Sequence, residues 1–131
     1  MRMRIENIIS EKDSLLVEGI TSIGRVCGVW RYNEKPILGE CYNFELDIEA
    51  LEDEKVIVLN DDKNISTEVY IDKDKVFFKG IVEQIDDIYV VRFSGDWIEM
   101  IEIEHDNHRI NTGDCIKFYQ TKRKMSIFPY D

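Results

Sequence analysis

The sequence has little proline and glycine, at 2 and 7 of 131 residues, and no segment has the composition of a linker. It lacks any run of about 18 apolar residues, which excludes a membrane-spanning helix. Its N-terminus lacks the apolar core and the small-residue cleavage site of a secretion signal. Its three cysteines are too few and too scattered for a disulfide framework. These absences predict a single cytoplasmic domain over residues 1–131.

Positive charge is also in short supply. The 17 Lys and Arg residues are outnumbered by 27 Asp and Glu residues, which gives a net charge of −10. Such a chain repels phosphate backbones and anionic lipid surfaces, so we expect neither a nucleic acid nor a membrane as its partner. Complementary charge favours a basic protein. Because many proteins are acidic without such a partner, composition alone leaves the question open.

Sequence motifs of nucleotide, hydrolase and metal chemistry are missing. There is no glycine-rich phosphate loop and no Gly-x-Ser-x-Gly elbow. The weak candidates for a metal site are His105, His108 and Cys115, without a Cys-x-x-Cys or His-Glu-x-x-His pattern. Carboxylates such as Glu99 and Glu102 are abundant, but nothing selects a catalytic pair. We therefore expect no enzyme and no cofactor.

The chain does contain many short runs of β-branched and aromatic residues, which indicate strands. The runs are 14–20, 24–32, 40–48, 55–59, 65–71, 75–85, 88–93, 97–104, 115–120 and 125–130. Helical patterns are weak, and residues 47–55 offer at most one short helix. Connections of two to five residues join antiparallel neighbours, so residues 55–104 should form a meander of hairpins.

We predict an all-β fold, a single antiparallel barrel or sandwich of about 8–10 short strands. The barrel is favoured because closure removes the exposed sheet edges that invite aggregation.

The clearest alternation lies in residues 40–48, where the acidic Glu45 and Asp47 stand between apolar residues. Acidic residues continue beyond this strand. The candidate acidic patch comprises Glu45, Asp47, Glu49, Glu52, Asp53, Glu54, Asp61 and Asp62. If these side chains converge in space, they can dock a basic protein, as an inhibitor or immunity-type partner of a basic enzyme does. If they do not, they are the solvent face of a half-buried strand. The leading hypothesis is a small acidic intracellular binding module that acts through protein contacts.

An alternative hypothesis rests on the one basic cluster, Lys122, Arg123 and Lys124, with Tyr119 nearby. In an OB-like barrel, basic loops and aromatic strand faces bind nucleic acid or a small ligand. The net charge favours a solvated hairpin tip instead.

Two segments share a pattern. Residues 39–44 (GECYNF) and 113–118 (GDCIKF) both read Gly, acid, Cys, apolar, polar, Phe. Duplication of a half-barrel and a recurring turn into a strand both explain this similarity, and the sequence does not choose between them.

Overall fold

The computed structural model describes residues 1–59 and 66–130, and strands make up 65% of the chain. The all-β prediction is confirmed. In chain order the strands are β1 (Arg2–Glu11), β2 (Ser14–Thr21), β3 (Gly24–Trp30), β4 (Cys41–Ile48), β5 (Leu51–Glu52), β6 (Val56–Val58), β7 (Glu68–Asp72), β8 (Lys75–Ile85), β9 (Tyr89–Ser94), β10 (Trp97–Ile101), β11 (Ile103–Glu104), β12 (Cys115–Thr121) and β13 (Met125–Tyr130).

Helical structure in the described residues is limited to two single-turn 3-10 helices, η1 (Asp53–Lys55) and η2 (Lys122–Lys124). Residues 47–55, where the sequence allows at most one short helix, contain the end of β4, then β5 and the single turn η1. Among the described residues there is no helix with the length and apolar character needed to cross a membrane.

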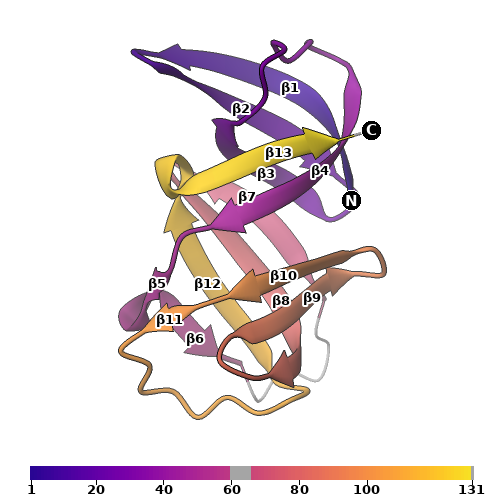
Figure 1. Cartoon of the computed structure of the whole chain (residues 1–131). Coiled ribbons are helices and arrows are strands. Elements are labelled where there is room, and N and C mark those ends of the chain that lie inside the picture. The colour runs from indigo at the N-terminus through magenta and orange to yellow at the C-terminus, as the bar shows by residue number, and fades with distance from the viewer. Residues whose placement is uncertain (60–65, 131) are drawn as a thin grey trace.

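Five strands close into a barrel, in the order β1-β2-β3-β13-β4 and back to β1 (Figure 1). Strand β4 returns beside β1 after the β1-β2-β3 meander, which is a Greek key. Strand β13 closes the gap between β3 and β4, and it runs parallel to β3. This connectivity is that of a five-stranded OB-type barrel. The preference for a barrel over a sandwich is therefore correct, although one of its pairings is parallel.

Strands β6, β7, β8, β9, β10 and β12 form a second sheet region, most of it below the barrel in Figure 1. Strand β7 also pairs with β3 of the barrel, and β5 and β11 form a separate two-stranded parallel sheet. Strand β8 pairs with β12 along one edge, and with β7 and then β9 along the other. The meander runs from β7 through β10, as expected. Strand β6 is not part of this meander. It pairs antiparallel with β12, where Val58 lies opposite Ile116. The prediction of a meander beginning at residue 55 was wrong at that end.

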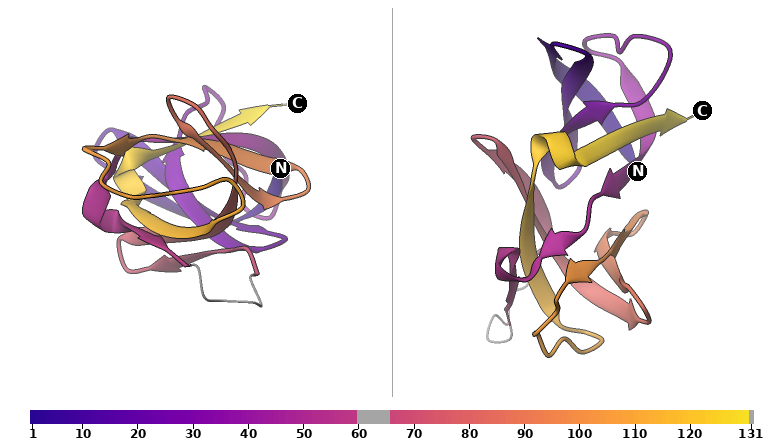
Figure 2. Two further views of the ribbon diagram at one scale, coloured as in Figure 1. Left: turned by 90° about the horizontal axis from the view of Figure 1, so that it is seen from below. Right: turned by 60° about the vertical axis from the view of Figure 1, so that its left-hand side comes forward.

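The chain passes from the barrel into the second region and later returns to the barrel. Strand β4 leaves the barrel through β5 and η1 to β6, which pairs with β12. Strand β12 then runs back through η2 to β13, which pairs with β4 in the barrel (Figure 2). Each region is therefore completed by a strand that follows directly from the other.

The similar segments enter the two regions through the same turn. Gly39 and Gly113 both have positive φ, 86° and 94°, which glycine adopts without strain. The N–H of Gly39 donates to the carbonyl of Ile5 at 2.8 Å, and the N–H of Gly113 donates to that of Val82 at 2.7 Å. A register shift follows at once in both partner strands, after Ile5 and after Val82. The shared sequence pattern thus marks a repeated structural device.

Aromatic side chains fill the core of the second region and connect it to the barrel. Phe78 and Phe118 stack with centroids 5.1 Å apart, and Phe93 and Trp97 pack against them. Trp97 also meets Phe44 of β4 edge to face at 5.5 Å. This last contact brings β10 alongside β4, and the candidate site lies between these two strands.

Candidate functional site

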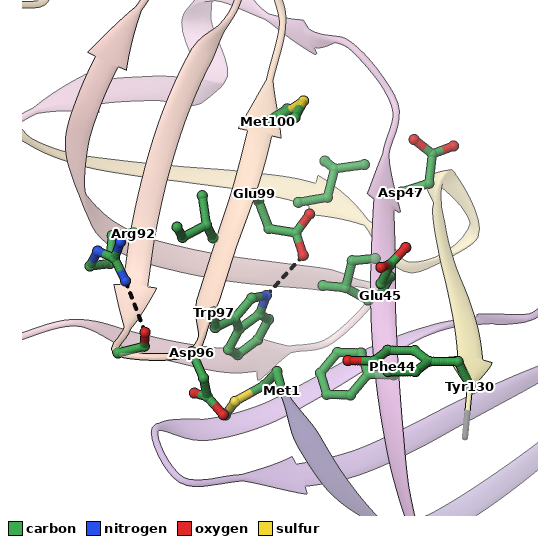
Figure 3. A pocket seen from close by; sticks show the side chains of 14 residues that line it. Met1, Phe44, Glu45, Asp47, Arg92, Asp96, Trp97, Glu99, Met100 and Tyr130 are labelled. Carbon is green, nitrogen blue, oxygen red and sulfur yellow. Dashed lines mark hydrogen bonds between the residues drawn. The ribbon is translucent and has the colours of Figure 1, made fainter.

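A groove with a volume of about 580 Å³ opens between β4 and β10 (Figure 3). Phe44 and Trp97 contribute to its lining from the two strands, and the two chain ends contribute Met1 and Tyr130. The alternation of β4 explains its lining. Phe44, like Leu46 and Ile48, points inward, whereas Glu45 and Asp47 are exposed.

The groove lies between two strand edges. In the described part of the chain, β1 pairs with β4 over Cys41–Asn43 alone, and β10 pairs with β9 alone. Within residues 1–59 and 66–130, no strand ladder joins β4 to β10. The backbone donors on this side of β4 find isolated acceptors instead. The N–H of Phe44 donates to the Met1 carbonyl at 2.9 Å, and the N–H of Leu46 donates to the Glu99 carboxylate.

Glu99 is the buried acid of the groove, with 9% of its surface exposed. It points inward because it shares the inner face of β10 with Trp97 and Ile101. The indole N–H of Trp97 donates to its Oε1 at 2.8 Å (Figure 3). Burial raises the pKa of Glu99 to about 7, and the charges of Glu45 and Asp47 add to this rise, whereas the two donors oppose it. The carboxyl group of Glu99 therefore titrates near neutral pH.

The groove carries negative charge overall. Glu45 and Asp47 stand on the β4 side, and the exposed Asp96 lies at the β9–β10 turn. Arg92 is the cationic side chain among the lining residues, and it already has several hydrogen-bond partners. Its guanidinium forms a bidentate ion pair with the Glu83 carboxylate. It also donates to the backbone carbonyls of Ser94 and Gly95, at 3.1 and 3.0 Å. The acids consequently dominate the field in the groove.

Apolar side chains flank these acids. Ile98 and Met100 lie on the outer face of β10 with 44% and 68% of their surfaces exposed, and Tyr130 at the end of β13 is 49% exposed. A ligand in the groove would therefore meet apolar surface as well as carboxylates.

The structure brings only part of the predicted acidic patch to the groove. Glu45 and Asp47 line it, whereas Glu49, Glu52, Asp53 and Glu54 do not. Asp53 instead accepts the backbone N–H of Asn107 at 3.0 Å and pairs with His108 at 3.2 Å. Asp61 and Asp62 lie outside the described residues.

Two acids of the groove, Asp96 and Glu99, were not selected from the sequence. Glu99 did leave a signal, because in the alternation of 97–101 it occupies an inward position between Trp97 and Ile101. Asp96 left none, since an acid in a turn is ordinary.

The predicted basic cluster is divided by the structure. Lys122, Arg123 and Lys124 form η2, and Arg123 makes a two-pronged ion pair with Glu11 at 2.8 and 2.9 Å. Tyr119 lies instead on the outer face of β12, where the ammonium of Lys75 sits 4.8 Å from the centre of its ring.

The metal candidates also occupy separate surroundings. The His108 ring contacts Asp53, His105 sits at a turn with φ of 50°, and Cys115 is buried at the start of β12. Nowhere in the described parts of the chain do three metal-binding side chains gather.

Known proteins give no further guidance to the site, because no family model, curated protein or solved structure matches this chain.

Proposed function

We propose that the protein is a non-enzymatic binding module that holds an extended, basic segment of a partner protein in the groove between β4 and β10. The observation that carries this proposal is a groove between two strand edges, with Glu45 and Asp47 on its rim and the buried Glu99 inside. An inhibitor of a basic enzyme is the narrower case, in which the bound segment borders that enzyme's active site.

The edges suit an extended peptide because a strand added to a sheet edge gains main-chain hydrogen bonds. The N–H of Leu46 now donates to the Glu99 carboxylate. An incoming strand offers a main-chain carbonyl for this donor. Because side chains alternate along a strand, a peptide with basic and apolar residues in turn can place its cations by Glu45 and Asp47. Its apolar residues then face Phe44 and Trp97.

Protonation adds a signature to this mode of binding. Glu99 has a pKa of about 7 in the free protein, so it is partly protonated at neutral pH. A lysine or arginine side chain close to this carboxyl favours its charged form and lowers the pKa. Binding of a basic segment near pH 7 should therefore release a proton, which calorimetry in buffers of different ionisation enthalpy detects.

The direct test uses a defined peptide of alternating lysine and valine. We expect its amide shift changes in an NMR titration to concentrate on β4 and β10. Replacing Glu45 and Asp47 by Gln and Asn should weaken binding by about tenfold at low salt, because exposed charge pairs contribute a fraction of a kcal/mol each. The matched control is the same change at Asp86 and Asp87, which are exposed in the β8–β9 turn.

Binding of an alternating glutamate and valine peptide with equal affinity would contradict the proposal. So would shift changes that avoid β4 and β10, or an equal loss of affinity in the control variant.

The cellular partner can be sought with a photo-crosslinking residue at Met100, an exposed residue of β10 at the rim of the groove. The same residue at Ile57, which is 56% exposed on β6, is the control. A partner captured at both positions equally does not occupy the groove.

A further inference from the structure

The two strands that bound the groove run in the same direction and converge. Phe44 and Trp97 face each other near the starts of β4 and β10, with ring centroids 5.5 Å apart. Further along both strands, the N–H of Leu51 donates to the Glu102 carbonyl at 2.8 Å, and β5 pairs parallel with β11. Figure 1 shows β4 and β10 approaching each other toward this short ladder. The groove is therefore a tapered opening between two parallel strands, closed at one end by β5 and β11.

The lining residues show where the groove ends. They stop at Ile48 on β4 and at Met100 on β10, just before the closed end. At the opposite end the lining includes Asp96 and Tyr130, which are exposed. A strand rises by about 3.3 Å per residue, so a guest strand has room for about four or five residues. A segment that lies along both strand edges must therefore end, or turn away, where β5 and β11 pair.

Glu99 lies toward this closed end, and its carboxylate occupies the position of a main-chain group. The N–H of Leu46 on the β4 edge donates to it, as it would donate to the carbonyl of a paired strand. The indole N–H of Trp97 donates to its Oε1 at 2.8 Å. A carboxylate has about four acceptor positions, so Glu99 can accept a further donor. A guest strand would meet this carboxylate in line with its own main chain, whereas its outward side chains would meet Glu45 and Asp47.

We propose that the groove receives the free N-terminus of a partner polypeptide, with the α-ammonium group against Glu99 and the chain antiparallel to β4 and β10. This inference rests on the proposed function, because it specifies which part of the basic segment enters the groove. The α-ammonium group supplies positive charge and hydrogen-bond donors at the point where the guest strand ends. Since β4 and β10 both run toward the closed end, a chain that starts there runs against them, and antiparallel pairing is the more stable arrangement.

The two other ways of filling the groove are less favourable. A C-terminus at the closed end would bring a carboxylate to Glu99, Glu45 and Asp47, and like charges repel. An internal segment would have to turn away before β5 and β11, and its main chain would bring no cation to Glu99. A free N-terminus avoids both costs.

The test compares two alternating lysine and valine peptides by isothermal titration calorimetry at pH 7, with NMR amide shifts to show that each occupies the groove. One peptide has a free N-terminus. The other is acetylated and has one more lysine at its C-terminal end, which restores the net charge, and both are amidated at the C-terminus. The peptide with the free N-terminus should bind about tenfold more tightly, because hydrogen bonds between charged groups are the strong ones.

A pair of variants locates the α-ammonium group. Glu99→Gln removes the negative charge and keeps the size of the side chain, so it should abolish the difference between the two peptides. Glu102→Gln is the matched control, at an exposed position outside the groove lining, and should keep the difference. Circular dichroism checks that both variants are folded.

The direction of the bound chain can be measured on the unaltered protein. A nitroxide spin label at the C-terminal end of the peptide should broaden the amide signals of Asp96 and Trp97, at the open end, more than those of Ile101 and Ile103. Stronger broadening at Ile101 and Ile103 would overturn the inference, because the peptide would then run in the opposite direction.

The remaining outcomes separate this inference from the proposed function. Equal binding of the two peptides to the wild-type groove would overturn the inference and leave the proposed function intact. An equal loss of the difference in Glu102→Gln would also overturn it, because the effect would then belong to net charge. If neither peptide shifts the amide signals of β4 and β10, the proposed function fails together with the inference.

Discussion

Replacing Glu99 by Gln should change how the stability of the protein depends on pH. Glu99 is 9% exposed, and burial raises the pKa of its carboxyl from the ordinary value of 4.5 to about 7. A raised pKa means that the folded state holds the proton more tightly than the unfolded state does. The stability contributed by this proton is complete below about pH 4.5 and is lost as the pH rises through 7. At about 1.4 kcal/mol for each pH unit, the loss amounts to about 3 kcal/mol.

The assay is urea unfolding of both proteins at pH 5 and pH 8.5, followed by far-UV circular dichroism. Glu99→Gln cannot titrate at this position, so the free energy of unfolding of this variant relative to wild type should rise by about 2.5 kcal/mol between the two pH values, because part of the loss has already occurred at pH 5. All other ionisable groups are the same in the two proteins, so their contributions cancel in the difference. Glu102→Gln, an exposed neighbour, should show no such change. If wild type and Glu99→Gln respond identically to pH, the carboxyl is not desolvated and our description of the groove interior is wrong.

Three further predictions concern the fold. Each region contains a strand that follows directly from the other region, so we expect the two regions to unfold together. Single-tryptophan variants that keep either Trp30 of the barrel or Trp97 of the second region should therefore report the same thermal midpoint. Two midpoints would show that the regions unfold separately. Cys41 is the exposed cysteine, so one of the three thiols should react with Ellman's reagent before unfolding, and Cys41→Ser should abolish that reaction. Phe118→Ala removes a buried ring stacked on Phe78 and should lower the free energy of unfolding by about 3–5 kcal/mol in denaturant titrations, whereas a loss below 1 kcal/mol would contradict this packing.

Local patterns in the sequence predicted the strands well, but they could not predict which strands pair with one another over long distances in the chain. The alternation in residues 40–48 gave both the strand and its buried face, because a period of two depends only on neighbouring residues. The parallel pairing of β3 with β13 joins Trp30 to Ile127, and no local pattern contains that information. The pairing of β6 with β12 was not predicted, for the same reason.

The acidic site was predicted in part, for the same physical reason. Glu45 and Asp47 were identified because they stand on the outer face of a single strand. The acids at 52–54 were added because they follow closely in sequence, but β5 and η1 carry them away from the groove. Glu99 comes from a strand more than fifty residues later, and the Phe44–Trp97 contact is what brings that strand to β4. Closeness along the chain is a poor guide to closeness across a barrel.

Net charge likewise gives no position for basic surface. A total of −10 describes the whole chain, but in solutions of about 0.1 M salt a charge is screened beyond ~10 Å, so a ligand responds to the charges beside it. The contiguous cluster 122–124 is conspicuous in sequence, yet Glu11 already pairs with its arginine. The lysines that gather in space, Lys55, Lys75 and Lys117, come from η1, β8 and β12, and the two strand lysines meet because every second residue of adjacent strands shares a face. An acidic groove and a cluster of lysines over aromatic rings therefore occur on one small protein whose net charge is −10.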